Sequence, residues 1–221
     1  MSRDAILAKI RARTSTGDEE TRRMIVDERL AEHRRNLIPA RGQGDEDHRI
    51  RVFTDMMLAV GGSVELLDDI NDVPQAIAAY LRNGNLPAQV RRGADPVLAK
   101  LPWHRSGALQ VDEGRAVDSD RASVTRAFAG VAESGTIVQV SGSDNPTTLN
   151  FLPEAHIVVL EAGRLVASYE EAWSRLREAF GEGTMPRSVN MISGPSRTGD
   201  IEQTIVRPAH GPKNMHVIIV R

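Results

Sequence analysis

The sequence predicts an α/β protein with a mostly parallel sheet, helices on both faces of that sheet, and an N-terminal helical extension. From residue 47 onward, amphipathic segments alternate with short apolar runs, which is typical of repeated β-α units. The run at residues 215–220 is almost entirely apolar, as expected for a central strand covered on both faces. The first 46 residues are polar and lack such runs. We therefore expect a helical extension at 1–46 and an α/β domain at 47–221.

The N-terminal extension is expected to contain two helices. Ile6, Leu7 and Ile10 recur at helical spacing after Ser2, which is a suitable N-cap residue. The second helix is predicted over residues 19–36 and has only a ragged apolar stripe. Pro39 and the Gly42-Gln43-Gly44 stretch then end the helical pattern, and nothing in the extension suggests catalysis.

The remaining elements follow from hydrophobic spacing and from Gly, Pro and Asn at the breaks. The predicted helices are residues 49–60, 73–81, 96–101, 119–129 and 170–180. The predicted strands are residues 64–67, 89–91, 136–140, 157–160, 189–192 and 215–220. Ala162-Gly163 is a turn signal, so residues 165–167 are expected to fold back as a hairpin. Residues 200–205 are expected to form a helical turn or two.

Composition narrows the classes of function. The chain has 221 residues and a formal net charge of -2, which gives no electrostatic reason to expect a nucleic acid or an anionic membrane as partner. It has no cysteine, which excludes disulfides, thiol catalysis and Cys-ligated iron–sulfur clusters within this chain. No apolar run approaches the roughly 18 residues of a membrane span, and no signal-peptide pattern follows Met1. We expect a soluble, cytoplasmic protein.

Common cofactor and catalytic motifs are missing from the sequence. G-x-G-x-x-G, Walker A, H-E-x-x-H and G-x-S-x-G do not occur, which weighs against nicotinamide dehydrogenases, P-loop nucleotidases, zinc proteases and standard α/β-hydrolases. His156, His210 and His216 lack the spacing of a local metal pair. The sequence therefore predicts neither a cofactor nor a metal site, and it leaves open whether the protein is an enzyme.

The first of three candidate loops is residues 192–200. It follows a predicted strand, and ligands of parallel sheets bind where strands end. Gly194 would permit close approach of a ligand, and Arg197 offers a planar fork for a carboxylate or phosphate. A helix start at Thr198 would add N–H donors for an anion. Further hydroxyl groups come from Ser193 and Ser196. An ordinary polar turn, with Asp200 matching the helix dipole, fits the local sequence equally well.

The second and third loops flank the predicted strand at 136–140. Before it, Glu133-Ser134-Gly135 places a carboxylate that could act as base or nucleophile, although an exposed glutamate followed by a helix-capping glycine is the favoured interpretation. After it, the loop 141–148 offers Ser141 and Asp144 to polar groups of a ligand, and it is equally acceptable as a plain turn.

The three histidines are each more often structural than functional in such positions. His156 precedes a buried strand and His216 lies within one. His210 lies in the rigid turn Pro208-Ala209-His210-Gly211-Pro212 and is the best functional candidate of the three, because it is on a loop.

Several of these motifs, in this order, resemble the LUD domain, and more closely the lactate-utilization protein C family. The stretch 193–203, followed by His210-Gly211-Pro212 and a final strand, carries the resemblance. The stretches 132–136 and 152–156 match the other landmarks of that family. The similarity covers about residues 50 to 221 and is strongest from residue 126 onward.

The resemblance implies a fold of the NagB/RpiA/CoA-transferase group and a role in oxidising L-lactate to pyruvate. It also implies two iron–sulfur partner proteins, with this chain as a non-redox component that binds them or an anionic small molecule. The candidate catalytic residues are Glu133, Asp200 and His210. The candidate ligand-binding residues are Ser134, Gly135, Ser141, Asp144, Ser193, Gly194, Ser196, Arg197 and Thr198.

Two other readings stay open at this point. In the CoA-transferase-like group a glutamate can attack an acyl-CoA, or the cleft can bind a sugar phosphate or a folate, so the chain could be an independent enzyme with Glu133 as nucleophile. It could also be a structural scaffold whose motifs are turns.

Overall fold

The computed structural model describes residues 2–14, 18–181, 183–200, 204–206 and 211–221. The chain divides into two compact units, residues 1–38 and 39–221. The first unit contains α1 (Arg3–Thr14) and α2 (Glu19–Glu32). Asp18 caps the N-terminus of α2, because its carboxylate accepts hydrogen bonds from the backbone N–H groups of Glu20 and Thr21. The two predicted helices are thus present, and the role of residues 1–46 as a separate domain stays a prediction.

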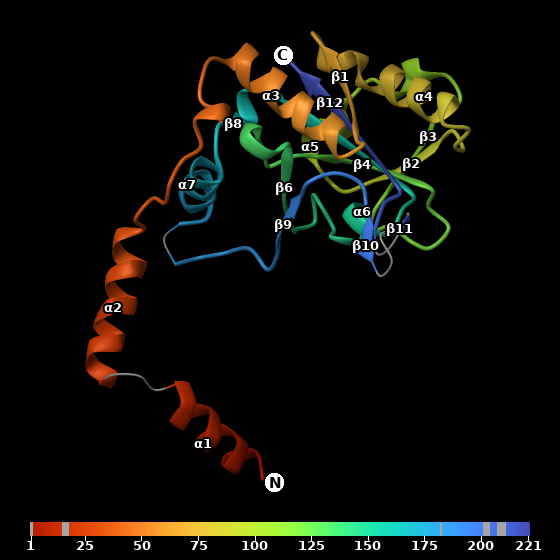
Figure 1. Ribbon diagram of the computed structural model, residues 1–221. Helices are drawn as coiled ribbons and strands as arrows, with labels where there is room; N and C mark the ends of the chain where they lie inside the picture. The colour runs from red at the N-terminus through yellow and green to blue at the C-terminus, as the bar shows by residue number, and fades with distance from the viewer. Residues whose placement is uncertain (1, 15–17, 182, 201–203, 207–210) are drawn as a thin grey trace. The chain divides into compact units, whose positions relative to one another are not determined.

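The second unit is built on a six-stranded sheet in which every neighbouring pair is parallel (Figure 1). Its strand order is β1-β12-β7-β4-β2-β3. The strands are β1 (Ser63–Leu67), β2 (Gln89–Arg92), β3 (Gln110–Glu113), β4 (Ala122–Arg126), β7 (Ala155–Glu161) and β12 (Asn214–Val220). The expected apolar strand near the C-terminus is β12, which lies between β1 and β7. The prediction of an α/β fold around a mostly parallel sheet is confirmed.

The parallel sheet is covered on both faces, and its strands alternate between two apolar clusters. On β7, Ile157 and Val159 face the cluster formed with α4 (Val73–Asn83) and α5 (Pro96–Lys100). The intervening Val158 and Leu160 face a second cluster, formed with α3 (Glu46–Ala59) and residues of a second sheet. All four side chains are fully buried. Burial on both faces explains why these strands are apolar along their whole length.

The second sheet has the order β8-β5-β6-β9. Its strands are β5 (Ala129–Val131), β6 (Thr136–Val140), β8 (Leu165–Val166) and β9 (Val189–Ile192). Strand β6 is antiparallel to both β5 and β9. Helix α7 (Tyr169–Phe180) packs against this sheet through Ala172 and Leu176. Two predicted strands, 136–140 and 189–192, therefore pair with each other in a separate sheet.

Three local predictions are wrong. Residues 119–129 contain β4 and the start of β5 instead of a helix, because alternating Ala122 and Val124 pack on one face of the sheet and Ser123 and Thr125 lie on the other. Residues 165–166 pair in parallel with β5 and form no hairpin with β7. At the two ends of the turn predicted at 200–205, the described residues form the antiparallel strands β10 (Thr198–Asp200) and β11 (Thr204–Val206), and residues 201–203 lie outside the described residues.

The remaining short elements lie between the longer helices and strands. They are the 3-10 turns η1 (Ala40–Gly42), η2 (Ile70–Asp72), η3 (Trp103–Ser106), η4 (Ala132–Ser134) and η5 (Ala162–Arg164), and the short helix α6 (Thr148–Phe151). Within the described ranges, no helix combines the length and apolar character that crossing a bilayer would require.

Candidate functional site

The candidate loops were expected at one edge of a parallel sheet. Strands β6 and β9 pair in antiparallel orientation instead, which separates these loops. Val140 pairs with Val189, and Ile137 pairs with Ile192. The loop after β6 therefore lies beside the start of β9, and the loop after β9 lies beside the start of β6. A five-residue strand spans about 13 Å, so the candidate residues fall into two groups at opposite ends of the second sheet.

The first group centres on a cluster of four hydroxyl groups. Thr136 Oγ1 lies 2.8 Å from Ser134 Oγ, 2.6 Å from Tyr169 Oη and 2.6 Å from Ser193 Oγ. Ser134 Oγ also donates to Tyr169 Oη at 3.0 Å. Thr136 is fully buried. The hydroxyl groups thus satisfy one another and join η4, β9 and the start of α7.

Two glycines of this first group make room for helix α3. Gly135 has a φ of 65°, and a Cβ there would lie 2.8 Å from the backbone N of Met57. Gly194 has a φ of 100°, and a Cβ there would lie 3.1 Å from Val60 Cβ. Such backbone angles favour glycine. Close packing against α3 therefore accounts for both glycines, including Gly194, for which the sequence suggested close approach of a ligand.

Glu133 follows β5 in this structure, whereas the sequence placed it after a helix. Its side chain is 5 % exposed, and Oε1 accepts the backbone N–H of Tyr169 at 3.0 Å. Oε2 is buried and has no hydrogen-bond partner within the described residues. Tyr169 is the first residue of α7, so the carboxylate lies at the positive end of that helix. This position suits a helix cap.

We expect Glu133→Ala to lower the free energy of unfolding by about 1–3 kcal/mol, because the partly buried N–H of Tyr169 loses its acceptor. Glu133→Gln keeps an oxygen at the same place and should cost less. Urea unfolding of both variants measures the difference. Equal stability of the alanine variant and the wild type would contradict the capping role.

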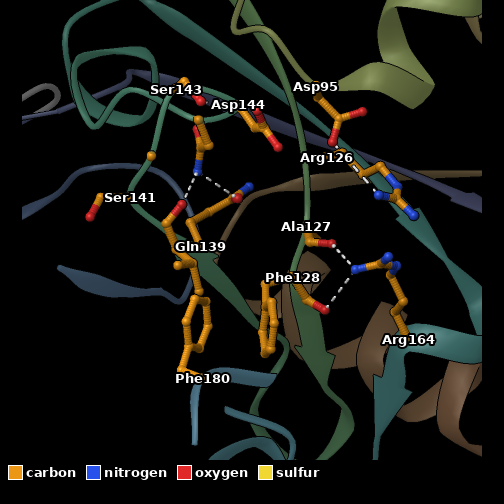
Figure 2. A pocket seen from close by; sticks show the side chains of 13 residues that line it. Asp95, Arg126, Ala127, Phe128, Gln139, Ser141, Ser143, Asp144, Arg164 and Phe180 are labelled. Carbon is orange, nitrogen blue, oxygen red and sulfur yellow. Dashed lines mark hydrogen bonds and ion pairs between the residues drawn. The ribbon is translucent and has the colours of Figure 1, made fainter. Parts of the chain in front are cut away.

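The second group lies where the parallel sheet reverses its winding. From β2 the chain proceeds to its outer neighbour β3, and from β4 it proceeds the other way to β7. Ligands of open α/β sheets bind at the carboxyl ends of strands at such a switch point. A cavity of about 340 Å³ lies there (Figure 2). Its polar lining includes Asp95, Arg126, Gln139, Ser141, Asp144, Asn145 and Arg164.

The loop after β6 is held over the end of β2. Ala94 donates its backbone N–H to the carbonyl of Ser143 at 3.1 Å, and Gly142 donates to the carbonyl of Asn145 at 3.3 Å. Gly93 permits the crossing, because a Cβ at this position would lie 2.6 Å from the carbonyl carbon of Asp144. Ser141 and Asp144, two of the candidate ligand-binding residues, are thereby placed at this cavity.

The charges around this cavity are largely balanced. Arg126 Nε contacts Glu161 Oε1 at 2.6 Å, and a terminal nitrogen of Arg126 lies 3.6 Å from Asp95 Oδ2. Arg164 lies 3.4 Å from Glu161 Oε2 and donates to the carbonyl of Phe128 (Figure 2). Burial acts to raise the pKa of Glu161, but the hydrogen bond and charge of Arg126 hold it below its ordinary value. Both arginines are therefore engaged by the protein.

A buried chain of polar side chains runs from the parallel sheet to the cavity. His156 Nε2 lies 2.8 Å from Thr125 Oγ1, which accepts from Gln139 Nε2 at 2.8 Å. Gln139 Oε1 in turn accepts from Asn145 Nδ2 at 2.9 Å. Asn145 is 6 % exposed, and its Oδ1 has no partner among the described residues. Asn145 therefore offers an unused acceptor beside the cavity.

The sequence identified only part of this site. It missed Asp95, Arg126, Gln139, Asn145 and Arg164. The loop after the strand at 89–92 was a usable signal for Asp95, since it follows a predicted strand. Arg126 was hidden by the incorrect helix at 119–129, and the two amides are recognisable only from their contacts across the two sheets.

The other candidate residues lie away from this cavity or outside the described residues. Ser196 donates its backbone N–H to the carbonyl of Pro212 at 2.8 Å, and Arg197 is exposed. Thr198 and Asp200 belong to β10, so no helix start stands behind Arg197. His210 lies outside the described residues. Within the described ranges, no group of three or more His, Asp or Glu side chains is arranged to hold a metal ion.

The sequence matches a family profile and several known proteins. The sequence profile of the LUD domain matches residues 50–220. "Lactate utilization protein C" of Geobacillus thermodenitrificans is 33% identical over 164 residues, which are 72% of this chain and 63% of that protein. The protein of the same name from Shouchella clausii is 37% identical over 90 residues, which are 41% of this chain and 39% of that protein. The matches thus span 39% to 63% of the lengths of these two relatives.

A solved structure supports the fold. The crystal structure of a DUF162 family protein from Deinococcus radiodurans matches with a TM-score of 0.63. The match covers 81% of this chain and 100% of that one, at 22% sequence identity. The likeness concerns the fold alone and agrees with the α/β architecture described above.

Proposed function

The chain belongs to the LUD domain family, and from this membership we propose that it is a non-redox component of a system that oxidises L-lactate to pyruvate. The observation that carries the proposal is the similarity over 164 residues to a protein named for lactate utilization. The chain has no cysteine with which to hold an iron–sulfur cluster. In this proposal, electrons pass through two iron–sulfur partner proteins. This chain binds those proteins or an anionic small molecule.

The cavity at the carboxyl ends of β2 and β4 is the proposed binding region. Its volume of about 340 Å³ lies within the roughly 300–1,000 Å³ typical of small-molecule sites. Asn145 Oδ1 supplies a buried acceptor for a donor group of the ligand. The ligand is proposed to be an anionic small molecule, and the same loops are available to a partner subunit.

Genetic and biochemical experiments test this proposal together. Deleting the gene should prevent growth on L-lactate and leave growth on pyruvate intact, because pyruvate lies beyond the proposed step. A tagged full-length chain should co-purify with the two iron–sulfur proteins from cells grown on L-lactate. Normal growth of the deletion strain on L-lactate, together with no association, would refute the proposal.

The alternative of an independent CoA-transferase-like enzyme requires Glu133 as nucleophile. Glu133 does not line the cavity at β2 and β4, and its Oε1 is engaged by the backbone of α7. We therefore advance no second function. Acyl-exchange activity that is lost in Glu133→Gln would reopen the alternative.

A further inference from the structure

A second cavity lies on the other side of the loop after β6. It has a volume of about 600 Å³, and it shares Ser141, Gly142 and Ser143 with the first cavity. Arg115, from the loop after β3, and Arg187, from the segment before β9, also line it. We call it the Arg115–Arg187 cavity. The antiparallel end of β6 and β9 forms its base, since Ser141 donates its backbone N–H to the carbonyl of Ser188 at 3.0 Å.

The Arg115–Arg187 cavity is positively charged. Its described lining contains two arginines and no aspartate or glutamate. Within the described residues, neither arginine has a carboxylate within ion-pair distance, in contrast to Arg126, which is paired with Asp95 and Glu161. The nearby Asp144 lines the first cavity and not this one. Two exposed arginines therefore line a space whose described lining supplies no counter-charge.

Two hydroxyl groups of the lining are held in position by backbone donors. Ser141 Oγ accepts the N–H of Ser188 at 2.9 Å, and Thr148 Oγ1 accepts the N–H of Ala116 at 3.1 Å. A hydroxyl oxygen that accepts one hydrogen bond still has its own proton to donate. The backbone contacts thus fix both oxygens and leave each O–H to serve a ligand. The lining combines oriented donors with positive charge.

Donors and positive charge together are the complement of an oxyanion. Guanidinium groups bind carboxylates and phosphates through charge-assisted hydrogen bonds, which are stronger than bonds between neutral groups. We propose that the Arg115–Arg187 cavity binds the carboxylate or phosphate group of a small metabolite. This inference rests on the proposed function in one respect, namely that the chain binds an anionic ligand.

Calorimetric titration of the full-length chain at low ionic strength tests the inference, with L-lactate, pyruvate and inorganic phosphate as separate probes. We expect at least one probe to bind, and Arg115→Gln and Arg187→Gln each to weaken binding about tenfold or more. Binding of the carboxylates alone would identify an organic acid as the source of the anion, and binding of phosphate alone would identify a phosphate ester. The matched control is Arg105→Gln, at an exposed arginine that lines neither cavity, and it should leave the affinity unchanged.

The inference is overturned if none of the probes binds at millimolar concentration, if a probe binds but Arg115→Gln and Arg187→Gln leave its affinity unchanged, or if Arg105→Gln weakens binding as much as the two cavity variants do. Its failure is distinguishable from failure of the proposed function. A chain that binds no probe but is required for growth on L-lactate would refute the anion site and leave the lactate role standing. A chain that binds through both arginines, in an organism that grows on L-lactate without it, would refute only the lactate role.

Discussion

Acidification from pH 6.5 to pH 5 is expected to lower the free energy of unfolding by up to about 2.7 kcal/mol per pH unit. Burial lowers the pKa of His156 to about 3 and that of His216 to about 4. Both rings are therefore neutral in the folded protein throughout this range. In the unfolded chain they take up protons near pH 6.5. Each histidine contributes at most about 1.4 kcal/mol per pH unit, because the unfolded state binds a proton that the folded state does not.

The direction and the window of this effect follow from the same pKa values. The stabilisation is fully present above pH 6.5 and declines as the pH falls, until the folded rings themselves are protonated near pH 4 and pH 3. His216 should contribute less than His156. A protonated His216 would gain from Glu65, whose Oε2 lies 3.5 Å from its Nε2, whereas His156 contacts the neutral Thr125.

Urea unfolding at pH 7, 6 and 5 measures the slope. His156→Gln and His216→Gln should each reduce it, by about 1.4 kcal/mol per pH unit or somewhat less. His104→Gln is the control, because the side chain of His104 is exposed in the folded protein. A free energy of unfolding that does not change between pH 7 and pH 5 would contradict the burial of neutral histidines.

Replacing Gly93 with alanine is expected to displace the loop that both cavities share. The added Cβ would overlap the carbonyl oxygen of Asp144 and lie 2.6 Å from its carbonyl carbon and 2.9 Å from Pro146 Cδ. A backbone carbonyl cannot move aside as a flexible side chain can, so the loop after β6 must shift. We expect a loss of about 1–3 kcal/mol in the free energy of unfolding. Anion binding should weaken roughly tenfold or more, since small displacements of positioning groups are costly.

Gly142→Ala is the matched control for this prediction. It lies in the same loop, and the nearest atom to its added Cβ is the backbone N of Asp144 at 4.0 Å, which is an ordinary contact. Its stability should therefore stay close to that of the wild type. If Gly93→Ala and Gly142→Ala are equally stable in urea unfolding, the crossing at Gly93 does not hold the loop in place.

The prediction from sequence succeeded where local pattern and burial coincide. The last strand, β12, was predicted as central because it is apolar on both faces, and helix α3 was predicted from its apolar spacing. It failed at β4, where small and hydroxyl residues that are buried on both faces of a strand show no clear period. It also missed β3, a short strand at the edge of the sheet.

The α/β class, the family and the loops in which polar residues gather follow from the amino-acid sequence alone. Which of those loops meet depends on how the strands pair in the folded chain. Side-chain patterns specify which faces of a strand are buried, but the backbone hydrogen-bonds in either direction, so the partner and its orientation depend on the whole fold. Because β6 runs antiparallel to β9, Ser141 lies beside Ser188 and Ser193 lies beside Thr136. The candidate site therefore lies at the carboxyl ends of β2 and β4 in the parallel sheet, and not at the loop after β9.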